Sequence, residues 1–305
     1  MGDVPNYVEP FGATLGVLLS RPTRPRTETV NDADALLCNF WRAVRAAPEE
    51  VACFADYPVS EVDLNARHRW LVETTREVSR GIRVRVEADP DFYDAKAAGW
   101  WVWGVCQWIG PNFCGYAYRD PKVAAEGTYY ARRRGTAHSH VKTMGKFPWR
   151  LPHLGNAGMG IHAPTFGDIA GVMGDLSVRL RRVRIACGDW RRVLTPAVTT
   201  FHGLTGVLLD PPYEEGRGDY PFPAAPGMWE EVARWAEENG GDPRLRIALC
   251  GYEGMRAPEG WRKHEWRAAG GYGARSDEGS RGRVNAGRER VWFSEHCLIE
   301  PSLPT

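Results

Sequence analysis

The stretch GVLLDPPYEEG, Gly206–Gly216, joins an apolar run to an acid, two prolines and an aromatic ring. The apolar residues are typical of a short buried strand, and Asp210 ends it. An Asp-Pro pair by itself indicates a turn. In an α/β sheet, however, ligands bind at the carboxyl edge, where the strands end. Asp210 is therefore either a plain turn residue or a functional acid, and the surrounding sequence has to decide between them.

Apolar runs of similar length recur on both sides of this stretch and predict further strands of the same sheet. Apolar residues at helical spacing predict one helix over Leu36–Val44 and another over Trp229–Ala236. Strands that alternate with helices predict a mostly parallel α/β sheet. Two late segments, WRKHEWRA and ERVWFS, predict a closing antiparallel pair. The other predicted strands are Asn6–Pro10, Thr27–Val30, Val183–Cys187 and Leu245–Cys250.

The middle of the chain does not continue this alternation. It holds helical patterns, a tryptophan-rich segment and a basic, loop-rich stretch. We therefore expect a sheet domain made of residues 1–45 and 183–305, with a mainly helical insertion over residues 46–182. The tryptophan cluster of that insertion is expected to pack inward, because large apolar clusters at this spacing normally form core. Its members are Trp100, Trp101, Trp103 and Trp108.

Composition limits the function classes. The chain has 305 residues, 43% hydrophobic and 25% charged, which is ordinary globular usage. The net charge is +1, so binding to a polyanion has to come from local patches. The 7 cysteines form no CxxC pair, and no run approaches the length of a membrane span. We expect a cytoplasmic protein with reduced thiols, no membrane partner and no metal site. The spacing of His138 and His140 near Cys106 and Cys114 matches no standard zinc site.

Four predicted strand ends carry residues suited to binding. Gly12, Ala13 and Gly16 follow the first strand, where small residues let a ligand approach backbone N–H groups. Asp32 follows the second strand, where an acid can bind a ribose diol. Asp189 follows the third, and Asp210 the fourth. A plain turn explains the first end equally well, and helix capping explains Asp32 and Asp189. None of these three ends decides the function alone.

Taken together, the motifs resemble those of the DNA adenine-N6 methyltransferases of the D12, or Dam-like, class. The tetrapeptide DPPY, Asp210–Tyr213, is similar to the catalytic motif of that family. YVEPFG followed by LGVLLSRP resembles its S-adenosylmethionine (AdoMet) motif, and NDADALLCNFWRAVR its acidic ribose-binding segment. VRIACGDWRRVL resembles the segment upstream of the catalytic motif, while RIALCGYEG and RERVWFSEHC resemble the closing strands. The motifs stand in the family's order. The resemblance implies a Rossmann-like AdoMet-dependent methyltransferase sheet, interrupted by an inserted, mainly helical target-recognition region.

The resemblance also implies a role for each residue of the tetrapeptide. The Asp210 carboxylate and the Pro211 carbonyl would accept hydrogen bonds from the exocyclic amine of an adenine, and Tyr213 would stack on that base. Pro212 and Pro211 suit this task because proline fixes φ and carries no N–H. Extruding a base from the duplex costs a few kcal/mol, and aromatic stacking returns roughly 1–3 kcal/mol. The implied AdoMet-binding residues are Pro10, Phe11, Gly12, Ala13, Gly16, Asp32, Asp189, Trp190 and Asp210.

One departure from the family concerns the AdoMet motif. The family pattern is close to Phe-x-Gly-x-Gly, whereas Phe11 is followed here by Gly12, Ala13, Thr14 and Leu15. Alanine and leucine therefore stand at the two glycine positions, and this change is expected to affect the affinity for AdoMet.

Double-stranded DNA is the expected partner, and a basic-aromatic stretch in the insertion is the expected contact. Lysines and arginines among aromatic rings suit phosphates and an unstacked strand. A solvated charged loop is the alternative. A second, weaker candidate is the segment RSDEGSRGRVNAGRER, Arg275–Arg290. The candidate DNA-binding residues are Arg132, Arg133, Arg134, Lys142, Lys146 and Arg150.

Two other functions remain open at this level. Methylation of cytosine N4 or of an RNA adenine uses similar chemistry with a related tetrapeptide. A non-catalytic DNA-binding protein with a decayed AdoMet site is the alternative from another class. The altered glycine positions favour this second alternative, whereas the intact Asp210–Tyr213 tetrapeptide speaks against it.

Overall fold

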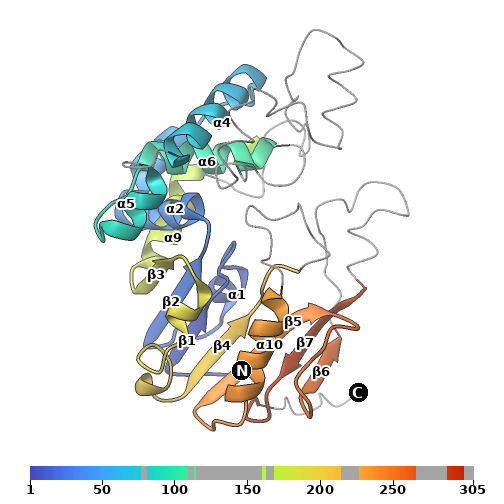
Figure 1. The fold of residues 1–305 in the computed structure, drawn as a ribbon. Helices are drawn as coiled ribbons and strands as arrows, with labels where there is room; N and C mark the ends of the chain where they lie inside the picture. The colour runs from blue at the N-terminus through green and yellow to red at the C-terminus, as the bar shows by residue number, and fades with distance from the viewer. Residues whose placement is uncertain are drawn as a thin grey trace, which may run out of the picture. The chain divides into compact units, whose positions relative to one another are not determined.

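The structure is a computed structural model that describes residues 1–76, 81–108, 113–114, 160–162, 168–213, 227–265 and 287–298. The chain forms two compact units. We call Met1–Asp34 with Arg181–Thr305 the sheet unit, and Ala35–Leu180 the helical unit. The second unit interrupts the first in the sequence, between the second and third strands (Figure 1).

The sheet unit is built on a seven-stranded sheet in the order β3-β2-β1-β4-β5-β7-β6. The first five strands of this order are parallel, and β7 runs antiparallel to both of its neighbours. The predicted mostly parallel α/β sheet and its closing antiparallel pair are therefore confirmed. The strands are β1 Asn6–Glu9, β2 Thr27–Asp32, β3 Val183–Cys187, β4 Thr205–Leu209, β5 Leu245–Tyr252, β6 Arg262–Glu265 and β7 Glu289–Phe293.

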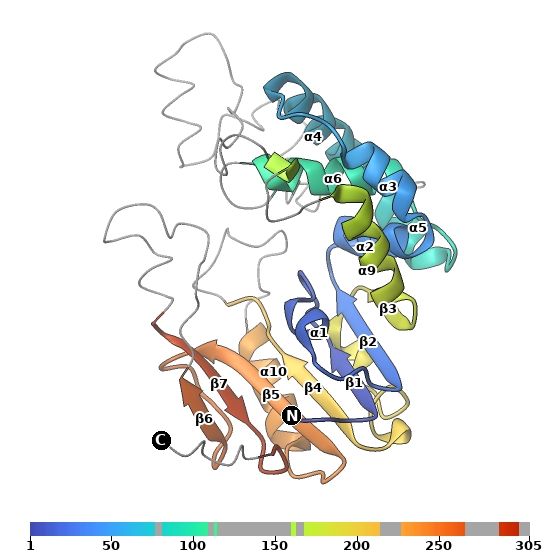
Figure 2. The same ribbon diagram turned by 180° about the vertical axis from the view of Figure 1, so that it is seen from behind.

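The strand order reverses between β1 and β4, which are neighbours in the sheet but far apart in the sequence (Figure 2). Open α/β sheets bind their ligands at such a switch point, beyond the carboxyl ends of the strands. Val8 pairs with Val207, so the two strands end nearly level with each other. The residues that follow them, Pro10–Phe11 and Asp210, consequently leave the sheet side by side.

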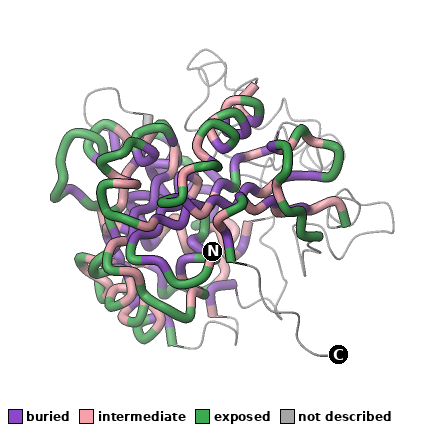
Figure 3. The backbone as a smooth tube through the Cα atoms, turned by 90° about the horizontal axis from the view of Figure 1, so that it is seen from below, coloured by how far each residue is buried: buried purple, intermediate pink, exposed green. Residues whose placement is uncertain are grey.

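Helices cover both faces of this sheet. The short helix α1, Gly16–Ser20, lies on one face; α10, Met228–Asn239, and the 3₁₀ turn η4, Trp190–Val193, lie on the other (Figures 1 and 2). A further 3₁₀ turn, η5, spans Thr200–His202. The central strands β1, β4 and β5 are mostly buried, whereas β6 is exposed along its length. Figure 3 colours the backbone by burial. On the α10 face the core consists largely of Val8, Val207, Leu209, Ile247, Leu249, Trp229, Val232 and Ala236.

The helical unit packs around α6, Ala95–Gln107, which contacts α2, α3 and α4. Gly99 marks a close crossing in that helix. A Cβ there would lie 2.4 Å from the Cβ of Phe54 and 2.7 Å from the Val51 carbonyl. The other elements are α2 Ala35–Ala46, α3 Pro48–Ala55, α4 Glu61–Arg76, α5 Ile82–Ala88, η3 Gly160–His162 and α9 Ile169–Leu180.

The division between the units differs from the expected boundary at residue 45. Helix α2 belongs to the helical unit, because it packs on α6 and α9. Its predicted apolar face is buried throughout, from Leu36 to Val44. The sequence pattern identified the helix and its buried face, but it did not reveal which domain covers that face.

The expected inward packing of the tryptophan cluster holds fully for Trp103, whereas Trp100, Trp101 and Trp108 are half-buried. Trp103 is fully buried, and its indole N–H donates to the Tyr57 carbonyl over 2.9 Å. Trp100 meets Trp70 edge to face at 5.1 Å, and Trp101 meets Phe40 at 5.6 Å. Within the described ranges, no helix has both the length and the apolar character needed to cross a membrane.

Candidate functional site at the carboxyl edge of the sheet

The turn after β1 is held tightly against β2. The N–H of Gly12 donates to the Asn31 carbonyl over 2.7 Å. A Cβ at Gly12 would lie 3.0 Å from the Leu15 side chain and 3.3 Å from that carbonyl, so a larger residue would push the turn away from β2. Glycine at this position therefore fixes the path of the chain into α1.

Ala13 and Leu15 both have left-handed backbones, with φ of 42° and 56°. These are the two positions where the resembled AdoMet motif carries glycine. Left-handed backbone is the region that glycine adopts freely and other residues adopt at a cost of roughly 1–2 kcal/mol. The chain thus keeps the backbone path of a glycine-containing turn without the glycines. Leu15 is also 1% exposed, so its side chain belongs to the core.

Asp32, the last residue of β2, connects this turn to the sheet. One carboxylate oxygen accepts the N–H of Ala13 at 2.9 Å, and the other accepts the N–H of Asp34 at 2.8 Å. Desolvation raises the pKa of Asp32, and the backbone N–H donors offset part of that rise. The donors that lower the pKa are the backbone N–H groups of Asp34, Ala13 and Ala33.

Asn31 joins three turns of the same edge, and the sequence argument did not identify it. Its amide nitrogen donates to the carbonyls of Pro10 and Gly188, both at 3.0 Å. Its amide oxygen is buried and has no hydrogen-bond partner among the described residues. A buried acceptor without a donor is costly, so this edge suits a group that brings a donor. The signal in the sequence was an asparagine directly before Asp32, at the end of a predicted strand.

Asp189 and Trp190 follow β3 and have different surroundings. Asp189 is exposed, accepts the N–H of Arg191 at 2.9 Å and pairs with the Arg191 side chain. It therefore caps η4, as the alternative interpretation predicted. Trp190 is buried, and its ring lies 5.9 Å from that of Phe11. The structure thus brings these two predicted cofactor-binding residues into contact.

Asp210 follows β4 directly and is exposed. Its carboxylate accepts a 3.0 Å hydrogen bond from the hydroxyl of Tyr213, three residues further on. Desolvation by the surrounding protein raises the pKa of Asp210, and the Tyr213 hydroxyl lowers it again in part. Pro211 is buried and Pro212 half-buried, so the two prolines pass between an exposed acid and a buried ring.

The ring of Tyr213 is not free to stack on a base in this structure. Tyr213 is 5% exposed and lies 4.4 Å from the Tyr252 ring. The Trp229 ring lies 6.4 Å away, edge to face. The expected stacking role therefore requires the ring to leave this contact, and no sequence pattern predicted that requirement.

Two further carboxyl groups lie close enough to Asp210 to affect its charge, and the sequence argument missed both. Glu9 is 2% exposed and accepts the Tyr7 hydroxyl at 2.6 Å. Burial raises the pKa of Glu9 to about 7, with the Asp210 charge as a smaller cause. Burial likewise raises the pKa of Glu289, at the start of β7, to about 7, again with help from Asp210. Glu9 ends β1, Glu289 begins β7, and Asp210 follows β4, so only the strand order brings the three carboxyl groups together.

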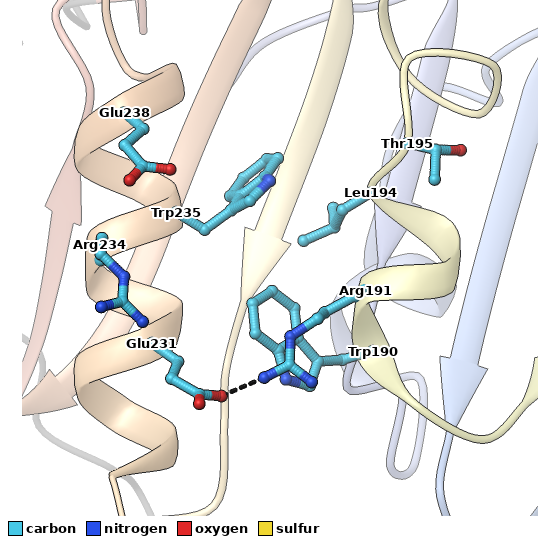
Figure 4. A pocket seen from close by; sticks show the side chains of 8 residues that line it. All are labelled: Trp190, Arg191, Leu194, Thr195, Glu231, Arg234, Trp235 and Glu238. Carbon is cyan, nitrogen blue, oxygen red and sulfur yellow. Dashed lines mark hydrogen bonds and ion pairs between the residues drawn. The ribbon is translucent and has the colours of Figure 1, made fainter.

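The α10 face carries a groove of about 230 Å³ (Figure 4). Trp190, Leu194 and Trp235 supply apolar walls, and an ion pair between Arg191 and Glu231 spans the groove. Asp210 is not among the lining residues. The groove is therefore separate from the row of polar groups at the strand ends.

The six candidate DNA-binding residues, Arg132, Arg133, Arg134, Lys142, Lys146 and Arg150, lie outside the described residues. Within the described ranges, no group of three or more His, Cys, Asp or Glu side chains could hold a metal ion. A comparison with protein-family models and with curated proteins finds no match to this chain.

Proposed function

We propose that this protein is a DNA methyltransferase that transfers a methyl group from AdoMet to the N6 amine of an adenine extruded from the duplex. The observation that carries the proposal is Asp210, an acid at the switch point of the sheet, followed at once by two prolines and a tyrosine. The D12-like order of the other motifs supports it.

The chemistry of the amine explains the residue types at this position. An exocyclic adenine amine is a weak nucleophile, because its lone pair is delocalised into the ring. The Asp210 carboxylate accepts a hydrogen bond from one N–H of the amine, and the Pro211 carbonyl accepts a hydrogen bond from the other N–H. These two bonds favour a pyramidal nitrogen with a localised lone pair. Neither proline offers an N–H that would compete for these acceptors. The Asp210 carboxylate, whose pKa is raised by desolvation, can take up the proton that the amine loses.

The residues after β1, β2 and β3 fit AdoMet as the cofactor. AdoMet supplies an activated methyl group on a sulfonium sulfur, and it carries ribose hydroxyls and an amine as hydrogen-bond donors. Asp32 accepts from the ribose hydroxyls, and the unpartnered oxygen of Asn31 accepts a further donor. The turn at Gly12–Ala13 leaves room for close approach to its backbone.

DNA binding is assigned to the helical unit and its basic stretch. Base recognition in this class requires a region beyond the cofactor sheet, and the chain supplies one between β2 and β3. The arginines and lysines of residues 132–150 contact phosphates, which fixes the position of the protein on the duplex but reads little sequence.

Nucleoside mass spectrometry tests the proposal directly. Purified protein is incubated with AdoMet and either DNA or RNA, and the methylated nucleosides are identified. We expect N6-methyladenine in DNA. N4-methylcytosine or methylated RNA adenosine would instead identify one of the related enzymes, and AdoMet binding without any methylated product would identify a non-catalytic protein.

Asp210→Ala is the informative variant, because Asp210 is exposed and its loss leaves the core intact. We expect methyl transfer to disappear while the far-UV circular dichroism spectrum stays that of wild type. Asp242→Ala is the matched control, since Asp242 precedes β5 at the amino edge of the sheet and pairs with Arg244 there. Equal loss of activity in both variants would contradict the assigned role of Asp210.

A further inference from the structure

The contact between Asp210 and Tyr213 raises a problem for the proposed reaction. Tyr213 donates its hydroxyl to the same carboxylate that has to accept the adenine N–H. Its ring is also covered, at 5% exposed, where a stacking ring has to be open. Within the protein itself, the Asp210 carboxylate therefore already accepts a hydrogen bond, and the Tyr213 ring is already covered.

The surroundings of Tyr213 form a built resting place. Tyr252 at the end of β5 supplies a tilted ring at 4.4 Å, and Trp229 at the start of α10 supplies an edge-to-face contact at 6.4 Å. Trp292 of β7 backs Trp229 at 6.0 Å. Aromatic pairs of these geometries are favourable beyond the burial of their area. Rings from β5 and α10 thus hold the Tyr213 side chain, and a ring of β7 supports one of them.

We propose that Tyr213 has two positions: in the free protein it rests against Tyr252 and Trp229 with its hydroxyl on Asp210, and it leaves this place when the target base arrives. The inference rests on the proposed function. Tyr252 is then a positioning residue for the reaction, because it holds the ring that the base has to recruit.

The losses and gains of the exchange are of the same kinds. Leaving the resting place loses one hydrogen bond to the carboxylate and the ring contacts. Arrival of the base offers stacking on the Tyr213 ring and new hydrogen bonds from its amine to Asp210. The resting contact also keeps the carboxylate satisfied and the ring out of water until a base is present.

The Tyr213→Phe variant tests this exchange, because phenylalanine keeps the ring and loses only the hydroxyl. The hydroxyl lowers the pKa of Asp210, so its removal raises that pKa in the free protein. The other groups that interact with this carboxylate, Glu9, Cys250 and Glu289, are unchanged in the variant. The pH dependence of kcat/KM reports free-enzyme groups, and that of the single-turnover rate at saturating DNA reports the complex.

We expect the acidic limb of kcat/KM for DNA to move to higher pH in Tyr213→Phe, and the acidic limb of the single-turnover rate to stay where it is. Tyr93→Phe, which removes an exposed hydroxyl, is the control. Equal movement of both limbs would overturn the inference, because Tyr213 would then remain on Asp210 in the complex. An unmoved kcat/KM limb would overturn it too, because the contact would not exist in the free protein.

Tyr252→Leu gives a second, binding-based test. It removes the ring on which Tyr213 rests, so the resting arrangement is less populated and the competent one more. We expect Tyr252→Leu to bind duplex DNA that carries the unmethylated target site a few-fold more tightly than wild type, as measured by fluorescence anisotropy. Tyr252→Phe should restore the wild-type affinity. Weaker DNA binding by a folded Tyr252→Leu protein would show that the Tyr252 ring has only a structural role, and it would overturn the inference. A wild-type protein that methylates nothing would instead refute the proposed function.

Discussion

The backbone N–H of Ala13, in the turn after β1, donates a 2.9 Å hydrogen bond to the carboxylate of Asp32 at the end of β2. The same carboxylate accepts the N–H of Asp34. Asp32 therefore has a structural task, holding the turn, in addition to the cofactor-binding task proposed for it. A substitution has to separate these tasks to be informative.

Asp32→Ala is expected to weaken AdoMet binding by roughly 1.5–3 kcal/mol, the usual worth of hydrogen bonds to a charged group, or roughly 10- to 150-fold. Isothermal titration calorimetry measures this loss. Asp32→Asn is the matched variant, since its amide oxygen still accepts the Ala13 N–H while the charge is lost. If Asp32→Asn binds AdoMet as wild type does, the turn rather than the charge is what matters. If both variants bind normally, Asp32 does not bind the cofactor.

Ala13→Gly is expected to stabilise the protein by about 1 kcal/mol. The left-handed backbone of Ala13 costs roughly 1–2 kcal/mol, and glycine removes this strain. Glycine also makes the unfolded chain more flexible, which destabilises the folded protein by about 0.4–1 kcal/mol and offsets part of the gain. Urea unfolding measures the difference. Thr14→Gly, at the adjacent residue without positive φ, is the control and should destabilise by about 0.5–1 kcal/mol. Destabilisation by both glycines would show that Ala13 is not strained.

Leu15 shares the backbone conformation of Ala13, yet the same replacement should have the opposite effect. Leu15 is 1% exposed, and burial of a leucine side chain contributes about 1.5–3 kcal/mol. Leu15→Gly therefore loses more from the core than it gains from relief of strain. A net destabilisation measured in the same urea series is the expected result. The chain thus tolerates alanine and leucine at the two glycine positions in different ways. Ala13 is exposed and keeps its backbone strain, whereas the packing of the Leu15 side chain compensates for the strain at Leu15.

The elements of the sheet could be predicted because their signals are local. The runs around Val8, Val207 and Ile247 are apolar and bounded by turn residues, and each became a strand of the sheet. Asp32 and Asp210 could be placed at the carboxyl edge for the same reason, since Asp32 ends one strand and Asp210 directly follows another. Periodicity thus determines where an element begins and which residues it buries.

The contacts between strand ends could not be predicted, because they depend on strand order. Asn31 hydrogen-bonds to Gly188 only because β3 lies beside β2, after an insertion of well over one hundred residues. Glu9 and Glu289 interact with Asp210 because β1 and β5 flank β4 and β7 follows β5. The burial of Tyr213 likewise depends on Tyr252, a residue of a different strand. No pattern within one segment carries this information.

Glu9→Gln should increase the stability of the protein at alkaline pH. Burial raises the pKa of Glu9 from 4.5 to about 7, so between these values the folded protein binds more protons than the unfolded chain. The free energy of unfolding consequently falls as the pH rises through this window, by on the order of 3 kcal/mol in total. Glutamine avoids the buried charge and still accepts the Tyr7 hydroxyl.

We therefore expect Glu9→Gln to match wild type near pH 4.5 and to exceed it by on the order of 1–3 kcal/mol at pH 8, measured by urea unfolding at both values. Glu49→Gln, at an exposed position of α3, is the control and should change neither value appreciably. A Glu9→Gln protein that is less stable than wild type at pH 8 would show that the carboxylate, once ionised, is stabilised by its surroundings rather than penalised.

Neutralising Arg132, Arg133 and Arg134 together should weaken DNA binding about equally across sequences, since phosphate contacts carry affinity and little base information. These arginines lie outside the described residues, so the prediction rests on the sequence. If all three contact phosphates, the slope of log K against log salt becomes shallower by about 0.9 for each lost contact on duplex DNA. AdoMet affinity and the methylated site should not change, because both depend on other parts of the chain.

The control has to remove the same charge from a surface that does not meet DNA. Arg24, Arg26 and Arg244 are exposed and lie before β2 and β5, at the amino edge of the sheet, away from the strand ends that hold the site. Replacing these three by glutamine should leave the salt slope unchanged, because counterion release counts only the phosphates that a protein neutralises. Equal slopes for the two triple variants would mean that Arg132–Arg134 form a solvated loop. The DNA contact would then have to be sought in the late basic segment around residues 281–290, where the same salt titration can be repeated.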